Sequence, residues 1–355
     1  MPKPMNEKIA ILGAGAVGGY VGAALARAGQ DVLLVDDWAE HVTEVQQSGL
    51  QIQEMDGEQW TAHPPIAHSS ELPTALAGTK VDIAIIAVKS YLTAPMTELI
   101  KDHLSPDGYA LSLQNCINEN TIAGILGWPR TTGGIASRIG VSLAGPGRIA
   151  RNMRRGDAEH IIFRVGEPDG QITPRIRRLF EIIAKVDSAK ITANLMGERW
   201  TKLSINAMHN AIAAVSGLTG QQCFAHAGVR RFAIELCGES VRVARALGHK
   251  LETINGLEAV RFVRAIEGNA ADLEAVHTAL LPDPANADSQ QRPSMGQDIL
   301  KGRKTEVEDM NGFVAAQGRK LGLKVAANAL ATDYVLQIEA GKLKQSPDLL
   351  TAYFS

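Results

Sequence analysis

Three polar side chains recur every fourth residue in one apolar segment, and their chemistry suits proton transfer. Lys202, Asn206 and Asn210 lie within ERWTKLSINAMHNAI. Side chains four residues apart stack on one face of an α-helix, and their apolar neighbours predict a largely buried helix. A buried lysine and two buried amides need partners. The stripe is therefore either a hydrogen-bond network between helices or a proton donor with two amides that hold a substrate.

A glycine-rich turn near the start of the chain could receive a nucleotide. KIAILGAGAVGGYVGAALARAGQDVLLVDD has the order strand, turn, helix, strand, which predicts parallel pairing with a right-handed crossover. Gly13, Gly15 and Gly18 form GxGxxG, for a tight turn, a close approach of pyrophosphate and close packing of the helix. The N–H groups of Ala16 and Val17 at the helix N-terminus complete the expected diphosphate site.

Two carboxylates at the end of the second predicted strand bear on the choice of cofactor. Asp36 directly follows the apolar strand residues and is placed to accept hydrogen bonds from the adenosine ribose hydroxyls. Asp37 either adds repulsion against a 2′-phosphate or points to solvent. Because no arginine stands beside them, we predict that NAD(H) is preferred and that NADP(H) is possible.

Two further strands are expected to end near the same site. VDIAIIAVKS (81–90) and YALSLQNCI (109–117) are typical of buried strands, and ligands of open α/β sheets gather at the carboxyl ends of strands. Lys89 and Asn115 are therefore expected beside the nicotinamide or the substrate. The alternative for Lys89 is a solvated charge.

A basic segment follows these strands. RIARNMRRGD contains Arg148, Arg151, Arg154 and Arg155. We favour an exposed basic loop, and the alternative is a clamp for a carboxylate or phosphate of the substrate.

The element pattern predicts an α/β Rossmann-type domain over 1–195, followed by an all-α substrate and dimerisation domain over 196–355. Within the first, TPRIRRLFEIIAKV (173–186) predicts a helix capped by Thr173. The second contains helical patterns only, including one over residues 294–322. An irregular stretch at 280–293 is typical of a lid or a mobile segment.

Composition excludes several classes of protein. The 355 residues are 45% apolar and 21% charged, with a net charge of −2, which gives no electrostatic bias toward nucleic acid or membrane. The three cysteines, Cys116, Cys223 and Cys237, are far apart, which argues against a disulfide framework or a zinc site. We expect a cytoplasmic protein without a bound metal, and no segment reads as a signal peptide or membrane span.

The chain resembles the ketopantoate reductase (2-dehydropantoate 2-reductase) family. The resemblance is carried, in order, by GAGAVGGYVGAALARAG, AVKSY, LQNCINEN, ERWTKLSINAMHNAI and SMGQDILKGRKTEVEDMNG; the last two are the most specific. It implies a Rossmann domain and a helical domain with the active site between them. It also implies reduction of a 2-keto acid by hydride transfer from a reduced nicotinamide, and a homodimer formed through the helical domain.

The resemblance also implies roles for individual residues. Lys202 matches the catalytic lysine, which would act as the general acid, and Glu306 matches its partner glutamate. The matching substrate and cofactor positions are Asn206, Asn210, Ser294, Lys89 and Asn115. Hydride addition to a ketone develops negative charge on its oxygen, which a lysine ammonium stabilises and protonates. From the residues themselves, Glu306 cannot be chosen over its neighbours Glu308 and Asp309.

This chain departs from the family pattern at several places. Asp37 stands where NADPH-dependent members usually carry arginine, and Cys116 replaces a glycine beside the nicotinamide. The stretches 148–155 and 251–293 look longer than in typical members. These departures motivate a second hypothesis, an NAD-dependent dehydrogenase of a larger or aromatic 2-hydroxy acid. A third, a non-catalytic dinucleotide sensor, is disfavoured because all the catalytic positions are retained.

Overall fold

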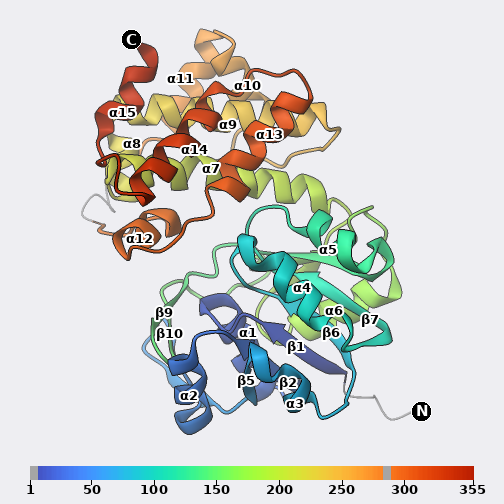
Figure 1. Cartoon of the computed structure of the whole chain (residues 1–355). Helices are drawn as coiled ribbons and strands as arrows, with labels where there is room; N and C mark the ends of the chain where they lie inside the picture. The colour runs from blue at the N-terminus through green and yellow to red at the C-terminus, as the bar shows by residue number, and fades with distance from the viewer. Residues whose placement is uncertain (1–6, 283–288) are drawn as a thin grey trace. The chain divides into compact units, whose positions relative to one another are not determined.

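The computed structural model describes residues 7–282 and 289–355, and its chain divides into two compact units, Met1–Leu195 and Met196–Ser355. Figure 1 shows the helices and strands of both units. The first is an α/β unit built on a mainly parallel sheet, and the second is helical, which confirms the predicted fold class. No helix among the described residues is both long and apolar enough to cross a membrane.

The first unit contains an eight-stranded sheet in the order β12-β11-β8-β7-β6-β1-β2-β5, in which only the β11–β8 pairing is antiparallel. Its strands are β1 (Lys8–Leu12), β2 (Asp31–Asp36), β5 (Ile66–His68), β6 (Val81–Ile86), β7 (Leu104–Ser112), β8 (Thr131–Ala136), β11 (Phe163–Gly166) and β12 (Ala189–Ile191). Its helices are α1 (Ala16–Arg27), α2 (Ala39–Ser48), α3 (Leu72–Leu76), α4 (Thr93–Lys101), α5 (Glu119–Leu126) and α6 (Pro174–Ile183), with short 3₁₀ turns at η1 (Ser69–Glu71), η2 (Ser90–Leu92) and η3 (Trp128–Arg130).

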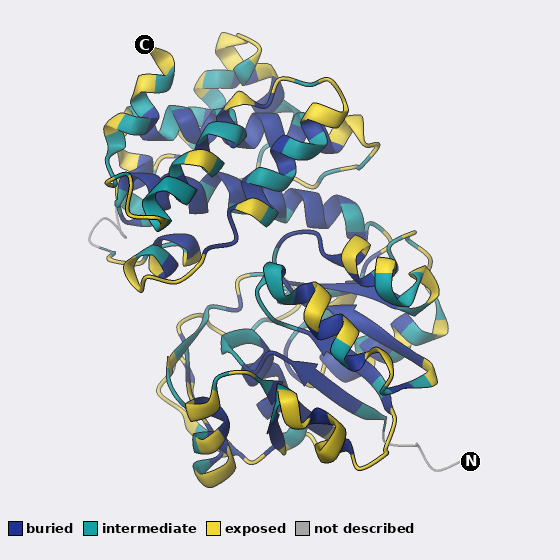
Figure 2. Ribbon diagram, viewed as in Figure 1, coloured by how far each residue is buried: buried dark blue, intermediate teal, exposed yellow. Residues whose placement is uncertain are grey.

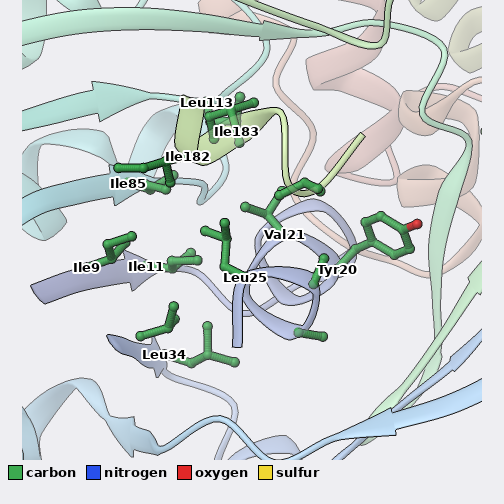
Figure 3. Close-up of a cluster of buried hydrophobic side chains, with 14 of the residues drawn as sticks. Ile9, Ile11, Tyr20, Val21, Leu25, Leu34, Ile85, Leu113, Ile182 and Ile183 are labelled. Atoms are coloured by element: carbon green, nitrogen blue, oxygen red, sulfur yellow. The ribbon is translucent and has the colours of Figure 1, made fainter. Parts of the chain in front are cut away.

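Strand β1 is the topological switch point of this sheet. It pairs in parallel with β2 on one side and with β6 on the other, so the chain changes direction across the sheet at the glycine turn that follows β1. Crevices at such points bind ligands in open α/β sheets. One face of β1 packs against α1 and α6 through Ile9 and Ile11 (Figure 3). The other face, with Ala10 and Leu12, packs in a cluster with residues of α3, α4 and α5, so both faces of the sheet are covered.

A second, four-stranded sheet lies in the same unit and was not predicted. Its order is β4-β3-β10-β9, and its strands are β3 (Leu50–Gln53), β4 (Gln59–Ala62), β9 (Val141–Gly145) and β10 (Arg148–Arg151). This sheet packs on α1. The helix predicted over 173–186 is α6, and the Thr173 hydroxyl caps it by accepting from the Ile176 N–H.

The interpretation of Arg148–Arg155 as an exposed basic loop is wrong for Arg151. Its side chain is fully buried, bonds the Asp187 carboxylate at 2.6 Å and donates to the Tyr20 hydroxyl at 2.7 Å. Arg155 pairs with buried Glu54 at 2.9 Å. A buried guanidinium persists only where it is paired, and its acidic partners are remote in sequence. Arg151 thus fastens the second sheet to α1.

The second unit contains helices only, apart from one isolated bridge between Ile254 and Leu257 in its described part. They are α7 (Leu195–Ser216), α8 (Gly220–Ala225), α9 (Ala227–Ala246), α10 (Val260–Ile266), α11 (Ala270–Ala279), α12 (Ser294–Leu300), the π-helical turn η5 (Glu308–Gly312), α13 (Phe313–Lys320), α14 (Ala326–Glu339), α15 (Pro347–Thr351) and the 3₁₀ turn η6 (Ala352–Phe354). Most of α7 and α9 is buried (Figure 2).

The continuous helical pattern predicted over 294–322 is wrong, because the chain forms α12, an irregular link, η5 and α13 there. Gly302, with φ +60°, ends α12, and the Arg303 N–H returns to the Asp298 carbonyl. A left-handed residue that closes the last turn is a common helix terminator. Of the irregular stretch 280–293, residues 283–288 lie outside the described residues.

Candidate functional site

The first glycine of the turn adopts a backbone conformation that side chains disfavour. Gly13 has φ +99°, and its N–H donates to the Val35 carbonyl at 2.8 Å. A Cβ atom here would lie 2.8 Å from Val88 Cγ1 and 2.9 Å from the Ala87 carbonyl carbon. Both the dihedral angle and the space therefore require glycine at this position.

Gly18 is required by contact with the turn itself. A Cβ atom at Gly18 would lie 1.9 Å from the Gly13 carbonyl oxygen and 3.0 Å from Ala87 Cβ. The motif predicts close packing of helix against strand. The tightest neighbour is instead the first glycine of the same motif, so Gly13 and Gly18 hold each other in place.

Gly15 differs from both, because a Cβ atom there would meet no atom within 4 Å. Gly15 caps α1 without a side-chain hydrogen bond, the first turn carries no acid, and Ala16 and Val17 are half-exposed. An open helix N-terminus with accessible N–H groups suits an anionic diphosphate. The residues present therefore fit a dinucleotide.

Asp36 and Asp37 differ in their surroundings. Asp36 is half-buried and accepts from the Ala14 N–H at 2.7 Å and from the Trp38 N–H at 2.9 Å, which ties the end of β2 to the glycine turn. A carboxylate has about four acceptor positions, so capacity remains for ribose hydroxyls. Asp37 is exposed and accepts a hydrogen bond from the Ser69 hydroxyl, a partner that the sequence did not indicate.

Lys89 and Asn115 lie beyond the strands to which they were assigned. The predicted strand boundaries at 81–90 and 109–117 extend too far, because β6 ends at Ile86 and β7 at Ser112. Both residues are half-buried, in the turns that follow those strands. The topology therefore places them at the carboxyl edge of adjacent parallel strands.

Buried polar residues fasten these two turns together. The Gln114 amide donates to the Val88 carbonyl at 2.9 Å and to the Thr93 hydroxyl at 2.8 Å. The Asn118 amide donates to the Asn115 carbonyl at 2.8 Å. Sequence reasoning missed Asn118, although asparagine is one of the residues that favour turns.

Cys116 has φ +61° and is buried. The resemblance places a glycine at this position, and the backbone keeps the left-handed conformation that glycine adopts without penalty. The cysteine therefore carries a conformational cost of about 1–2 kcal/mol.

The polar stripe of the second unit lies on one uninterrupted helix of 22 residues, α7. The Asn210 side-chain oxygen accepts from the Ser294 hydroxyl at 3.2 Å and from the Met295 N–H at 3.1 Å. Its amide donates to the Asn206 carbonyl at 3.0 Å. The fold thus joins Ser294, at the start of α12, to the stripe, and Asn210 already takes part in a network between helices.

Burial distinguishes Glu306 from Glu308 and Asp309, the acids among which the sequence could not choose the partner of the lysine. Glu306 is 5% exposed, whereas Glu308 is exposed and pairs with Lys304 at 3.3 Å. Asp309 is half-buried, and burial, followed by the charges of Glu306 and Glu308, raises its pKa. Glu306 alone is shielded from water, as a partner for a charged lysine would be. Its pairing with Lys202 stays a prediction.

Among the described residues, no group of three or more histidine, cysteine, aspartate or glutamate side chains could hold a metal ion. Burial also raises the pKa of the Cys223 thiol to about 11, so this cysteine stays a packing residue.

Comparisons with known proteins agree with this geometry. The model of the N-terminal part of ketopantoate reductase PanE/ApbA matches residues 9–160, and the model of its C-terminal part matches 194–339. The 2-dehydropantoate 2-reductase of Pyrococcus horikoshii is 27% identical over 91% of this chain and 94% of its own. That of Mesorhizobium japonicum is 28% identical over 88% and 91%.

Solved structures show the same fold over nearly the whole chain. A PanE/ApbA family ketopantoate reductase from Ralstonia eutropha has a TM-score of 0.75 and 26% identity, with 94% of this chain and 99% of that chain covered. A D-mandelate dehydrogenase with NADH and anilino(oxo)acetate has a TM-score of 0.75 at 23% identity, with the same coverage, which is a likeness of fold. The chain therefore belongs to the ketopantoate reductase family, whose members are nicotinamide-dependent oxidoreductases that act on CH–OH groups.

Proposed function

We propose that this protein is an NADH-preferring reductase that converts a 2-keto acid to a 2-hydroxy acid, with Lys202 as the general acid. The observation that carries the proposal is the contact of Ser294 with Asn210. It joins the α12 segment to the α7 stripe, so residues 84 positions apart that match the family's substrate-binding set come together. A purely structural helix pair would not need a lysine two turns away on the same face.

In this mechanism the α7 residues bind and protonate the substrate. When bound, NADH supplies the hydride. The Lys202 ammonium stabilises the negative charge that develops on the keto oxygen and then donates its proton to that oxygen. Glu306 keeps Lys202 positively charged in a partly desolvated place. Asn206 and the Ser294 hydroxyl orient the substrate, and Asn210 fixes that hydroxyl.

The cofactor preference rests on the two carboxylates after β2. Asp36 is tied to the glycine turn and retains acceptor positions for ribose hydroxyls. Asp37 is held by Ser69 at the position where NADPH-dependent members usually carry arginine. A carboxylate there repels a 2′-phosphate. We assign Lys89 and Asn115 to contacts with the cofactor beside its nicotinamide.

A cofactor-resolved assay with ketopantoate tests these assignments. We expect NADH to be oxidised with a kcat/KM at least about tenfold above that for NADPH, because the loss of ribose hydrogen bonds and the charge repulsion each cost on the order of 1 kcal/mol. The Asp37→Arg variant should reverse or narrow the preference. A wild-type preference for NADPH would overturn the role of the carboxylates.

The second candidate is an NAD-dependent dehydrogenase of a larger or aromatic 2-hydroxy acid. Cys116 favours it, because the family position beside the nicotinamide carries a thiol rather than glycine. A panel of aliphatic and aromatic substrates, assayed in both directions, separates the two. We also propose that the protein is a cytoplasmic homodimer, to be tested by light scattering on the purified chain.

A further inference from the structure

The π-helical turn η5 follows Glu306 and has an unusual register. The Met310 N–H bonds the Glu306 carbonyl at 2.9 Å, four residues back, whereas the Gly312 N–H bonds the Val307 carbonyl at 2.9 Å, five residues back. One extra residue is therefore accommodated between Glu306 and α13. Single π-type turns of this kind occur frequently at functional sites.

Glu306 lies at the start of this turn, because its carbonyl accepts the first hydrogen bond of the turn. Asn311 lies within the turn and is buried. The two residues therefore belong to one short hydrogen-bonded segment.

Asn311 ties this segment to α7. The Asn311 amide donates to the Ala207 carbonyl at 3.1 Å, and Ala207 lies on α7 between Asn206 and Asn210. Asn311 is 0% exposed, and Glu306 is nearly as buried. The Asn311–Ala207 bond thus holds the turn that begins at Glu306 against the helix that carries Lys202.

The Asn311 side chain also belongs to a network of buried polar side chains. Its amide also donates to the Asn328 side-chain oxygen at 3.0 Å, and the Asn328 amide donates to Glu239 at 2.9 Å. Glu239 further accepts from the Ala327 and Asn328 N–H groups. All three side chains are almost fully buried, so this hydrogen-bond network links α9 and α14 rigidly to η5.

The Asn311 side chain has a further feature that packing does not require. Its oxygen is buried and has no hydrogen-bond partner within the described residues, which is energetically unfavourable. An apolar side chain would avoid this cost, but it could not bond the Ala207 carbonyl. The amide is therefore suited to fixing the distance between η5 and α7.

We propose that Asn311, carried by the π-helical turn, is a positioning residue that sets Glu306 against α7 and, through Glu306, orients the ammonium of Lys202. This inference rests on the proposed function, in which Lys202 donates the proton. Asn311 itself does not touch the substrate.

A double-mutant cycle tests the proposal in the full-length enzyme. Asn311→Ala should lower kcat/KM roughly tenfold or more in the wild-type background, with the loss in kcat rather than KM, because residues that share one backbone segment couple at this level. In the Glu306→Gln background, Asn311→Ala should lower kcat/KM by less than about twofold. Equal losses in both backgrounds would show that Asn311 acts only through general stability and would overturn the proposal. Ser204→Ala, which removes another buried hydrogen bond of α7, is the matched control and should show no such dependence on Glu306.

A second measurement does not require turnover. The rate at which acetic anhydride modifies Lys202, followed by peptide mass spectrometry, should rise by the same factor in Asn311→Ala and Glu306→Gln. Both changes weaken the ion pair that keeps the lysine protonated, and only the unprotonated amine attacks the anhydride. Unchanged labelling in Asn311→Ala would overturn the inference. Asn311→Asp, which keeps the shape but exchanges the donor for an acceptor, replaces Asn311→Ala if that variant does not fold. If wild-type enzyme reduced no 2-keto acid, the proposed function would fail while the labelling comparison still decided the role of Asn311.

Discussion

The glycine turn of the first unit is formed mainly by backbone groups, whereas the α7 stripe of the second is formed by side chains. The turn consists of backbone from residues 13–18 and one carboxylate, Asp36, bonded to it. The stripe consists of side chains on α7 that are completed by residues from α12 and η5, about 84 to 104 positions away. The turn of unit 1 is therefore formed within one local segment, whereas the stripe of unit 2 consists of groups whose arrangement depends on tertiary packing.

Mutations in the two regions are therefore expected to have separable effects. Changes in the turn act through backbone space, because its N–H groups remain whatever the side chain. Changes in the stripe act through particular polar atoms and should spare cofactor binding.

The largest effect is expected for Lys202→Met. Removal of the proton donor should lower kcat about 10²–10⁴-fold, the usual contribution of a general acid, while NADH binding measured by fluorescence titration stays within about twofold of wild type. Lys301→Met changes an exposed lysine after α12 and is the control. A variant that lost NADH binding and turnover in parallel would contradict the separation of the two regions.

Gly18 and Gly15 should respond in opposite ways to the same added methyl group. Gly18→Ala forces a carbon 1.9 Å from the Gly13 oxygen, so we expect a loss of roughly 3 kcal/mol in the free energy of unfolding. In Gly15→Ala the added methyl group meets open space, so the free energy of unfolding should change by less than about 1 kcal/mol. The same methyl group should obstruct the diphosphate and weaken NADH binding at least about tenfold. Urea unfolding and NADH titration of both variants check this. Retained NADH affinity in Gly15→Ala would place the diphosphate elsewhere.

The sequence predicted the glycine turn well because that site is local. Spacing alone identified Gly13, Gly15, Gly18 and the acid at the end of β2, and the parallel β1–β2 pairing is confirmed. The same reasoning found α7 and the N-cap of α6. Each of these features depends on neighbours within about one strand–helix–strand unit.

Sequence reasoning failed where distant partners decide the outcome. Arg151 reads as a solvated charge until Asp187 and Tyr20 are seen beside it. The pattern over 294–322 is helical throughout, but Gly302 and the π turn break it so that Asn311 can reach α7. The choice of Glu306 over Glu308 likewise follows from burial, which a run of three acids within four residues does not encode.

A smaller effect within the stripe helix concerns pH. The His209 ring packs on Phe224 at 4.6 Å between centroids, and burial lowers its pKa to about 4. Between about pH 6.5 and 4 the unfolded imidazole binds a proton that the folded one does not, so stability falls as the pH drops through this window. The shift corresponds to roughly 3 kcal/mol at its lower end. Unfolding of wild type and His209→Leu at several pH values isolates this contribution, since the other titrating groups are common to both. An identical pH slope in the two proteins would show that His209 takes up its proton as readily in the folded state as in the unfolded state.

The smallest effect is expected at Cys116, in the loop after β7, where the backbone also adopts a conformation that favours glycine. Cys116 has φ +61°, so Cys116→Gly relieves about 1 kcal/mol of backbone strain while it loses a comparable amount of buried thiol packing. We expect its stability to equal that of wild type within about 1 kcal/mol, whereas Cys116→Ala loses the packing and keeps the strain. The glycine variant should therefore be the more stable of the two by about 1 kcal/mol in urea unfolding. An alanine variant as stable as the glycine variant would mean that this loop relaxes away from the left-handed conformation. The position beside Asn115 would then be adaptable in a way that the turn at Gly13 is not.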